Sequence, residues 1–176
     1  VWQVSMMERF GRLTFPNGRA GCPIIDGDIV IIRGVTSYWG ADGPARDRFF
    51  GFDKNTGELL WSSTPGVGPP FLKDTSMSTP FLETRDGKRV FYAATGCGNI
   101  VCVNVLDGTP LWRWQVSKGG INSSPVVYGD TVINIHGKEN LDTTEMGRIF
   151  RINIPKDLDN TGGEIDPVMK GAPRIT

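Results

Sequence analysis

The chain has 176 residues, of which 39% are hydrophobic and 22% charged, enough apolar material for a core, so a disordered chain is excluded. Its 19 basic and 19 acidic residues cancel, which argues against a general binder of nucleic acid or anionic membranes. Gly and Pro, 23 and 12 residues, interrupt the chain too often for a helical bundle, and no apolar run reaches the roughly 18 residues of a membrane span.

The chain begins with a strand-like run, Val1-Trp2-Gln3-Val4-Ser5, and residues 1–10 are expected to end one structural unit. Neither a signal peptide nor an initiator Met precedes this run, and no capping element closes the far end. We therefore expect a fragment of a longer chain, in which case the missing export signal says nothing about the compartment.

A hairpin pattern follows and occurs three times. In Cys22–Ile31 two short apolar runs flank the turn Asp26-Gly27, and Ser124–Ile133 repeats the Pro, Gly and Asp at the same places. A looser copy has Ser78-Thr79-Pro80 before its first run and Asp86-Gly87 at its turn. Each copy predicts two antiparallel strands joined by a tight turn.

A second pattern consists of a strand, a Gly turn and a strand that ends in Trp. It follows the hairpin Cys22–Ile31 and the looser hairpin that begins at Ser78. The Gly supplies a positive φ at the turn. The repeated positions are Asp53, Thr56, Gly57 and Trp61 in one copy, and Asn104, Gly108 and Trp112 in the other. Trp2-Gln3-Val4-Ser5 is identical to Trp114-Gln115-Val116-Ser117, so Trp2 corresponds either to Trp112 or to Trp114.

The repeats lie about 45 to 57 residues apart, which suits four short strands with their turns. We therefore predict an all-β fold of four-stranded antiparallel meanders, the blades of an incomplete β-propeller. A β-sandwich is the alternative, but sandwiches do not repeat their turn residues at a fixed period. The chain is expected to be one partial propeller domain, with one blade ending at about 1–10 and further blades at about 20–64, 78–117 and 122–165.

Asp53-x-x-Thr56-Gly57-x-x-x-Trp61, and the run from Thr95 to Val105, resemble the pyrroloquinoline-quinone-type repeat of quinoprotein-like propellers. The resemblance covers Val1 to about Ile154 and implies an eight-bladed ring in which the repeat Trp residues dock one blade on the next. The copies depart from the pattern: Asn104 replaces the Asp, Asp107 replaces the Thr, and the third blade loses the Gly-to-Trp half after Asn153. The family holds alcohol and sugar dehydrogenases, an outer-membrane assembly lipoprotein and other exported proteins, so the resemblance implies a periplasmic or extracellular location but no single activity.

With the strands of a blade termed A to D, antiparallel order places the A–B and C–D turns on one face. The B–C and D–A connections lie on the other, and they include the long segments 35–48, 62–77, 117–122 and 137–147. We name this second side the long-loop face. Long loops on a rigid scaffold are where binding usually occurs.

The segment 36–48 mixes aromatic, Gly and charged residues. As a contact for a ligand or partner it offers Tyr38 and Trp39 as anchors and Arg46 or Arg48 for an anion. The favoured alternative is that Trp39 folds over its own blade and the charges are solvated.

His136, the sole histidine, ends a B strand on this face near Asp142 and Glu145. It is a candidate contact, but no Ser or Cys lies at a motif spacing, so no catalytic residue is assigned. Asp157 and Asp159 resemble the start of a calcium loop, yet Val168 stands where the closing acid is needed. A plain turn without metal is therefore expected.

The three cysteines, Cys22, Cys97 and Cys102, lack the spacing of a zinc site. A disulfide between Cys97 and Cys102 across a hairpin stays open. The favoured interpretation is that Cys22 and Cys102 are small hydrophobes within strands and that Cys97 lies in a turn.

The leading hypothesis is a non-catalytic exported propeller, a scaffold or binding domain that meets a protein or small molecule through its long-loop face and needs no cofactor. The alternative is a segment of a pyrroloquinoline-quinone-dependent alcohol or sugar dehydrogenase. For that enzyme the resemblance implies a quinone stacked on Trp, a Ca²⁺ held by acid and amide side chains, a catalytic Asp and often a vicinal Cys pair. No vicinal Cys pair occurs in this sequence, and the calcium and catalytic positions find no match.

Overall fold

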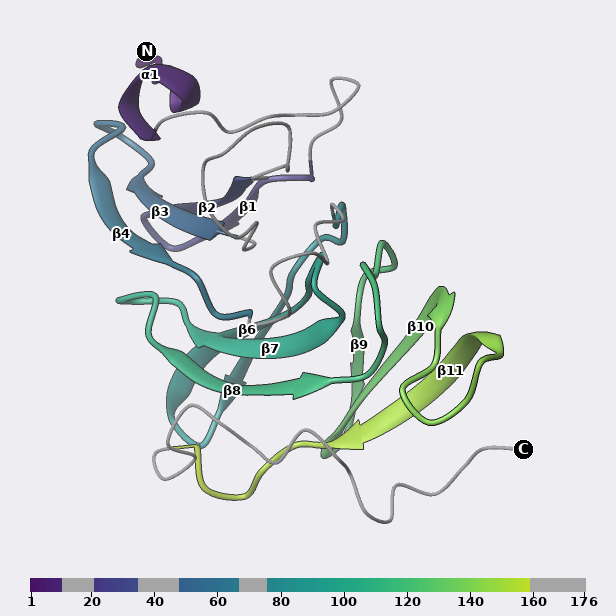
Figure 1. Cartoon of the computed structure of the whole chain (residues 1–176). Coiled ribbons are helices and arrows are strands. Elements are labelled where there is room, and N and C mark those ends of the chain that lie inside the picture. Colours follow the sequence, from purple (N-terminus) through teal and green to yellow (C-terminus); the bar gives the residue numbers. More distant parts are fainter. Residues whose placement is uncertain (11–20, 35–47, 67–75, 159–176) are drawn as a thin grey trace.

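The structure is a computed structural model that describes residues 1–10, 21–34, 48–66 and 76–158. In these residues one short helix and three antiparallel sheets follow one another along the chain (Figure 1). The first sheet is blade 1, with β1 (Ile24–Asp26), β2 (Ile29–Gly34), β3 (Arg48–Asp53) and β4 (Leu59–Ser63). Blade 2 has β5 (Phe81–Arg85), β6 (Lys88–Ala94), β7 (Asn99–Asn104) and β8 (Pro110–Gln115). Blade 3 has β9 (Val126–Tyr128), β10 (Thr131–Glu139) and β11 (Met146–Asn153).

Strands pair in chain order within each sheet, which confirms the all-β class and the antiparallel meander. One backbone hydrogen bond recurs in all three blades and aligns them. A residue just after strand C donates to a carbonyl at the beginning of strand B: Lys54 to Asp28 (2.8 Å), Val105 to Arg89 (2.9 Å) and Ile154 to Asp130 (2.9 Å). Residues can therefore be compared between blades by counting from this bond.

The turns between strands C and D contain the chemistry that the motif predicts. Gly57 and Gly108 have φ of 74° and 73°. The Asp53 carboxylate accepts hydrogen bonds from the backbone N–H groups of Asn55 and Thr56, both 2.8 Å, and the bonds from Thr56 and then Asn55 lower its pKa. Asn104 accepts the matching bond from Leu106 at 2.9 Å. The departure from Asp to Asn is tolerated because the turn needs an acceptor oxygen and not a charge.

The N-terminal segment differs from the predicted strand end. Val1–Ser5 is not in a sheet, and α1 (Met6–Phe10) follows it as a helix of 5 residues. The Ser5 hydroxyl accepts from the N–H of Glu8 (3.4 Å), and the Ser5 carbonyl accepts from Arg9 (3.1 Å). Ser5-x-x-Glu8 is therefore a helix-start signal that the strand interpretation overlooked.

The core lies between the sheets. Ile31, Phe49 and Trp61 of blade 1 pack on Phe91 and Val103 of blade 2. The other side of blade 2 then packs on blade 3, and its cluster includes Tyr92, Ile100, Trp112, Val132 and Ile152. Each blade thus presents one sheet face to its successor and the opposite face to its predecessor.

The repeat Trp residues join neighbouring blades as predicted. Trp61 is only 7% exposed, and its ring lies so close to Gly108 that a Cβ there would be 2.6 Å from it. Its Nε1 donates to the carbonyl of Val105 at 3.0 Å. We call this arrangement, a Trp ring over the C–D glycine of the next blade with Nε1 bonded to a turn carbonyl, the tryptophan latch.

Trp2 forms the same latch on blade 1. A Cβ on Gly57 would lie 2.5 Å from its ring, and its Nε1 donates to the carbonyl of Lys54 at 2.8 Å. Trp61 lies opposite Gly51, and Trp112 lies opposite Cys102 at the same place in blade 2. Trp2 therefore corresponds to Trp112, which settles the choice that the identical tetrapeptides left open.

Trp112 meets a different surface. It is fully buried and packs with Ile152, Ile154 and Leu158, but its Nε1 has no hydrogen-bond partner among the described residues. Blade 3 loses the repeat pattern after Asn153, and the described residues that follow, up to Leu158, contain no glycine to receive this ring. The latch here is apolar only.

Candidate functional site

On the long-loop face, the structure describes every residue of the hairpin between β10 and β11. Strand β10 runs on to Glu139, and Asn140 forms a β-bridge with Ser117 in the connection that follows blade 2. The N–H of Lys118 donates to the carbonyl of Glu139 at 3.0 Å, and the two side chains form an ion pair. The hairpin of blade 3 is therefore fastened to the loop of blade 2.

The tip of this hairpin is held by its own polar groups. Arg148 pairs with Asp142 at 2.9 Å, and the Asn140 amide donates to the carbonyl of Glu145 at 2.9 Å. Leu141 and Met146 are left 38% and 66% exposed. The tip thus combines a fixed backbone with apolar side chains in solvent.

His136 is buried within this hairpin. Its side chain is 3% exposed, its Nδ1 lies 3.0 Å from the carbonyl of Lys138, and its ring centroid lies 5.9 Å from that of Phe150. Burial, with a contribution from Arg148, lowers its pKa, so the imidazole is neutral near pH 7. The carboxylate of Asp142, one of its predicted neighbours, pairs with Arg148 instead.

A buried polar cluster that the sequence did not suggest lies between blades 1 and 2. The Arg33 guanidinium donates to the Ser76 hydroxyl (2.8 Å), to Ser78 (3.1 Å) and to the Ala94 carbonyl, and it lies 4.7 Å from the Phe49 ring centroid. Ser76 donates in turn to the Ile121 carbonyl, which leads into blade 3. An arginine ending the apolar run of β2 was the available signal. The cluster ties the connections of three blades together.

The other predicted contacts are placed only in part. Arg48 begins β3 opposite Gly34. Tyr38, Trp39 and Arg46 lie outside the described residues, so their grouping with Arg48 stays a prediction.

Of the two weak metal candidates, the structure describes only one. Asp157 is exposed just beyond β11, and Asp159 lies outside the described residues. Within the residues that the structure describes, no three His, Cys, Asp or Glu side chains gather to hold a metal ion.

None of the three cysteines forms a disulfide. Cys22 is exposed and precedes β1, so the prediction of a small hydrophobe inside a strand is wrong for it. Cys97 lies in a turn as predicted, yet it is buried, with Thr95 Oγ1 at 3.3 Å and Asn99 Nδ2 at 3.0 Å. Cys102 is buried in β7, and burial raises the pKa of its thiol, which keeps it protonated.

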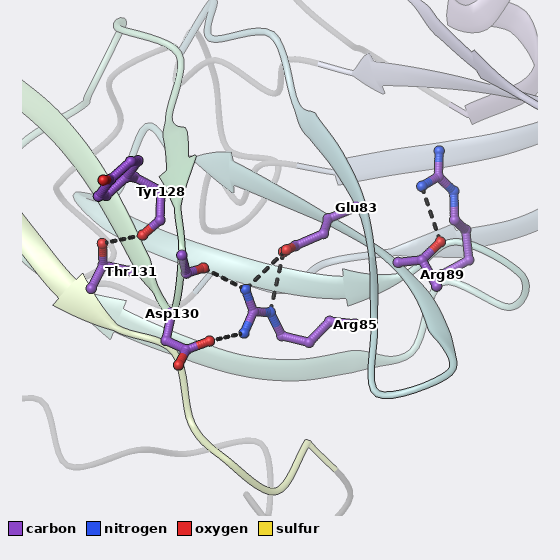
Figure 2. A network of polar contacts seen from close by, with 8 residues as sticks. Glu83, Arg85, Arg89, Tyr128, Asp130 and Thr131 are labelled. Carbon is purple, nitrogen blue, oxygen red and sulfur yellow. Dashed lines mark hydrogen bonds and ion pairs between the residues drawn. The ribbon is translucent and has the colours of Figure 1, made fainter.

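The opposite face has ion pairs at both blade junctions (Figure 2). Asp26, just before the A–B turn of blade 1, pairs with Arg89, just after that turn in blade 2, at 2.7 Å. The equivalent residues at the next junction are Glu83 and Asp130, both acidic. Arg85 lies between them, 2.9 Å from Glu83 and 2.7 Å from Asp130. Burial opposes its charge, but both carboxylates outweigh this and raise its pKa.

Among the described residues, no helix has the length and apolar character to cross a membrane.

Residues 50–146, more than half of the chain, match the family described as outer membrane protein assembly factor BamB. No curated protein matches the chain.

The chain is similar to parts of several solved structures. BamB from Moraxella catarrhalis is 17% identical, with 75% of this chain and 32% of that chain covered and a TM-score of 0.49. A europium-containing methanol dehydrogenase is 17% identical, with 78% and 24% covered and a TM-score of 0.50. A quinohemoprotein alcohol dehydrogenase from Comamonas testosteroni is 16% identical, with 76% and 21% covered and a TM-score of 0.49.

This chain spans less than a third of each of these structures, and at such identities the likeness concerns the fold alone. The family match is independent of that likeness and covers the motif of strand, Gly turn and Trp in blade 2. The chain therefore belongs to the family of PQQ-like β-propeller repeats that bears the description outer membrane protein assembly factor BamB.

Proposed function

We propose that the chain is part of a non-catalytic, exported propeller, periplasmic or extracellular, that serves as a scaffold or binding domain through its long-loop face. The observation that supports this proposal is how the hairpin between β10 and β11 uses its charges. Lys118 with Glu139, and Arg148 with Asp142, pair with one another. These groups hold loops in place and are not converged on a substrate.

The chemistry of the same region argues against an acid–base or nucleophilic site. A general base must be accessible to the group that it deprotonates, whereas His136 is only 3% exposed. The exposed residues at the tip include the apolar Leu141 and Met146 beside the polar Asp142, Thr144 and Glu145. Exposed apolar side chains on a rigid backbone suit the surface of a protein partner better than a small polar substrate.

A site-specific crosslinking experiment tests the binding face. A photoreactive amino acid replaces Leu141 in the intact protein, in its own cell envelope, and the matched control replaces Leu106. Leu106 is 69% exposed in the turn between β7 and β8, on the opposite face. We expect a discrete crosslinked partner from position 141 and not from 106. Equal crosslinking at both positions contradicts the proposal.

The alternative, a segment of a quinone-dependent dehydrogenase, has a direct assay. The intact protein is incubated with pyrroloquinoline quinone and Ca²⁺, and oxidation of alcohols and aldoses is followed with an artificial electron acceptor. We expect no turnover, because the described residues bring no three His, Cys, Asp or Glu side chains together. Turnover that disappears when a chelator is added would establish the dehydrogenase instead.

A further inference from the structure

His136 lies on the side of blade 3 that packs against blade 2. Side chains alternate along a strand, so Val132 and Asn134 of β10 share this side with it. Val132 belongs to the apolar cluster between the two blades, and the Asn134 amide donates to the Ser123 carbonyl at 3.2 Å in the connection between them. The imidazole is therefore enclosed between two sheets that the structure describes, and these residues already reduce its exposure to 3%.

The imidazole spans a β-bulge at the base of the hairpin tip. His136 lies opposite Arg148 and Glu139 lies opposite Met146, so β10 has one residue more than β11 between these pairs. Nδ1 of His136 lies 3.0 Å from the carbonyl of Lys138, within the bulge. A carbonyl only accepts hydrogen bonds, so Nδ1 carries the proton of the neutral ring and Nε2 carries the lone pair.

The second ring nitrogen has no place for a proton. Nε2 of His136 is buried and has no hydrogen-bond partner among the described residues. A proton there would leave a buried N–H without an acceptor and a buried charge without a counterion. Burial lowers the pKa of this imidazole and Arg148 adds to the effect, while the bond to the Lys138 carbonyl opposes it.

The surrounding charges do not offset such a proton. Arg148 is the direct partner of His136 in the register, so the two side chains share one side of the hairpin. The other charged side chains on the elements packed around this position are Lys138, Glu139, Asp142 and Glu145 of the hairpin and Lys118 of the connection after blade 2. Asp142 is bonded to Arg148, Glu139 is paired with Lys118, and no described carboxylate bonds to the imidazole.

We propose that protonation of His136 opens the bulge and releases the hairpin tip, residues 140–146, from the connection after blade 2. Local opening brings Nε2 into contact with water, which accepts the new N–H. The backbone bonds lost are those from Asn140 to Glu145 at 3.1 Å and from Lys118 to Glu139 at 3.0 Å. The tip is then fixed at neutral pH and loosened in acid. Its consequence for binding rests on the proposed function: a partner held by the tip is released on acidification.

Hydrogen exchange of the intact protein, corrected for the intrinsic pH dependence of amide exchange, measures the opening. Between pH 7.5 and pH 5.5 we expect protection of the Asn140 and Lys118 amides to fall about three- to tenfold, because opening takes up at most one proton at His136. The Lys54 amide, bonded to the Asp28 carbonyl in blade 1, is the internal control and should stay constant. Constant protection at the tip, or an equal fall at Lys54, overturns the proposal.

His136→Gln is the matched variant, because its amide is polar but does not titrate. We expect the tip of this variant to lose the pH dependence, and a fall as large as in the unchanged protein overturns the proposal. Nuclear magnetic resonance of the imidazole in the unchanged protein gives a second measurement that needs no folded variant. We expect titration below pH 6.5, together with the loss of tip protection, and titration at or above 6.5 overturns the proposal. Neither measurement needs a partner, so their failure is distinct from a failure of the crosslinking at position 141, which tests the proposed function.

Discussion

Trp61→Ala tests the tryptophan latch, on which the joining of blades 1 and 2 depends. The indole is nearly buried, it stacks on Phe91 with centroids 6.4 Å apart, and it donates to the buried carbonyl of Val105. Truncating such a side chain costs about 3–5 kcal/mol of unfolding free energy, which lowers the melting temperature by roughly 6–20 °C in a chain of this size. Trp39→Ala, outside the described residues, is expected to change it little.

A double-mutant cycle with Gly108 separates the latch from ordinary burial. A Cβ on Gly108 meets the Trp61 ring at 2.6 Å, and the residue also has φ of 73°. Gly108→Ala therefore carries both a clash and a backbone cost, whereas in the Trp61→Ala background only the backbone cost of about 1–2 kcal/mol remains. Urea unfolding of the four proteins at concentrations where the chain is monomeric measures the coupling. Additive losses refute the latch, and equal losses for Trp39→Ala and Trp61→Ala mean that the repeat phase is wrong.

Three further predictions concern single side chains. Arg85→Met should cost about 1–3 kcal/mol of unfolding free energy, because two carboxylates at a blade junction lose their shared cation. Lys54→Met removes one partner of an exposed ion pair and should cost less than about 1 kcal/mol. Chemical denaturation measures both losses. The pKa of His136 lies below its ordinary 6.5, so on acidification the unfolded chain takes up the proton first. The free energy of unfolding should therefore fall as pH drops below 6.5, by at most about 1.4 kcal/mol per pH unit. His136→Gln should flatten this part of the stability profile, and an unchanged slope would show that the imidazole is not buried as described. Gly57→Ala should destabilise more than Gly129→Ala, since both have positive φ but only the Gly57 Cβ meets the Trp2 ring, and thermal melts with similar shifts would contradict this.

Most of the local structure could be predicted from residues that are neighbours in the sequence. The turns at Asp26-Gly27 and Gly57 follow from residues that accept positive φ or cap a turn through a side-chain oxygen. The apolar runs on either side become strands, and their fixed period predicted blades before any contact was known. Ser5-x-x-Glu8 was equally local, and it was missed because the identical Trp2–Ser5 and Trp114–Ser117 segments favoured a strand.

The candidate site was predicted only as a face and not as a set of side chains. The sequence placed His136 at the end of a strand on the long-loop face, but its burial depends on Phe150 in β11 and on how the hairpin closes over it. The Arg33 cluster was missed altogether, since its partners Ser76 and Ser78 come from the next blade. No periodic pattern within β2 reveals that an arginine there will be enclosed.

The sequence by itself determined the kind of strand, the kind of turn and the repeat, because backbone conformation depends on a few neighbouring residues. Only the tertiary structure decided which Trp corresponds to Trp2. It also decided that Arg85 pairs with two carboxylates. Both depend on the register between blades: Trp61 bonds to a carbonyl 44 residues away, and Arg85 pairs with an acid 45 residues away. Pairing across a junction is set by how two sheets pack, and the sheets exist as surfaces only after the chain has folded.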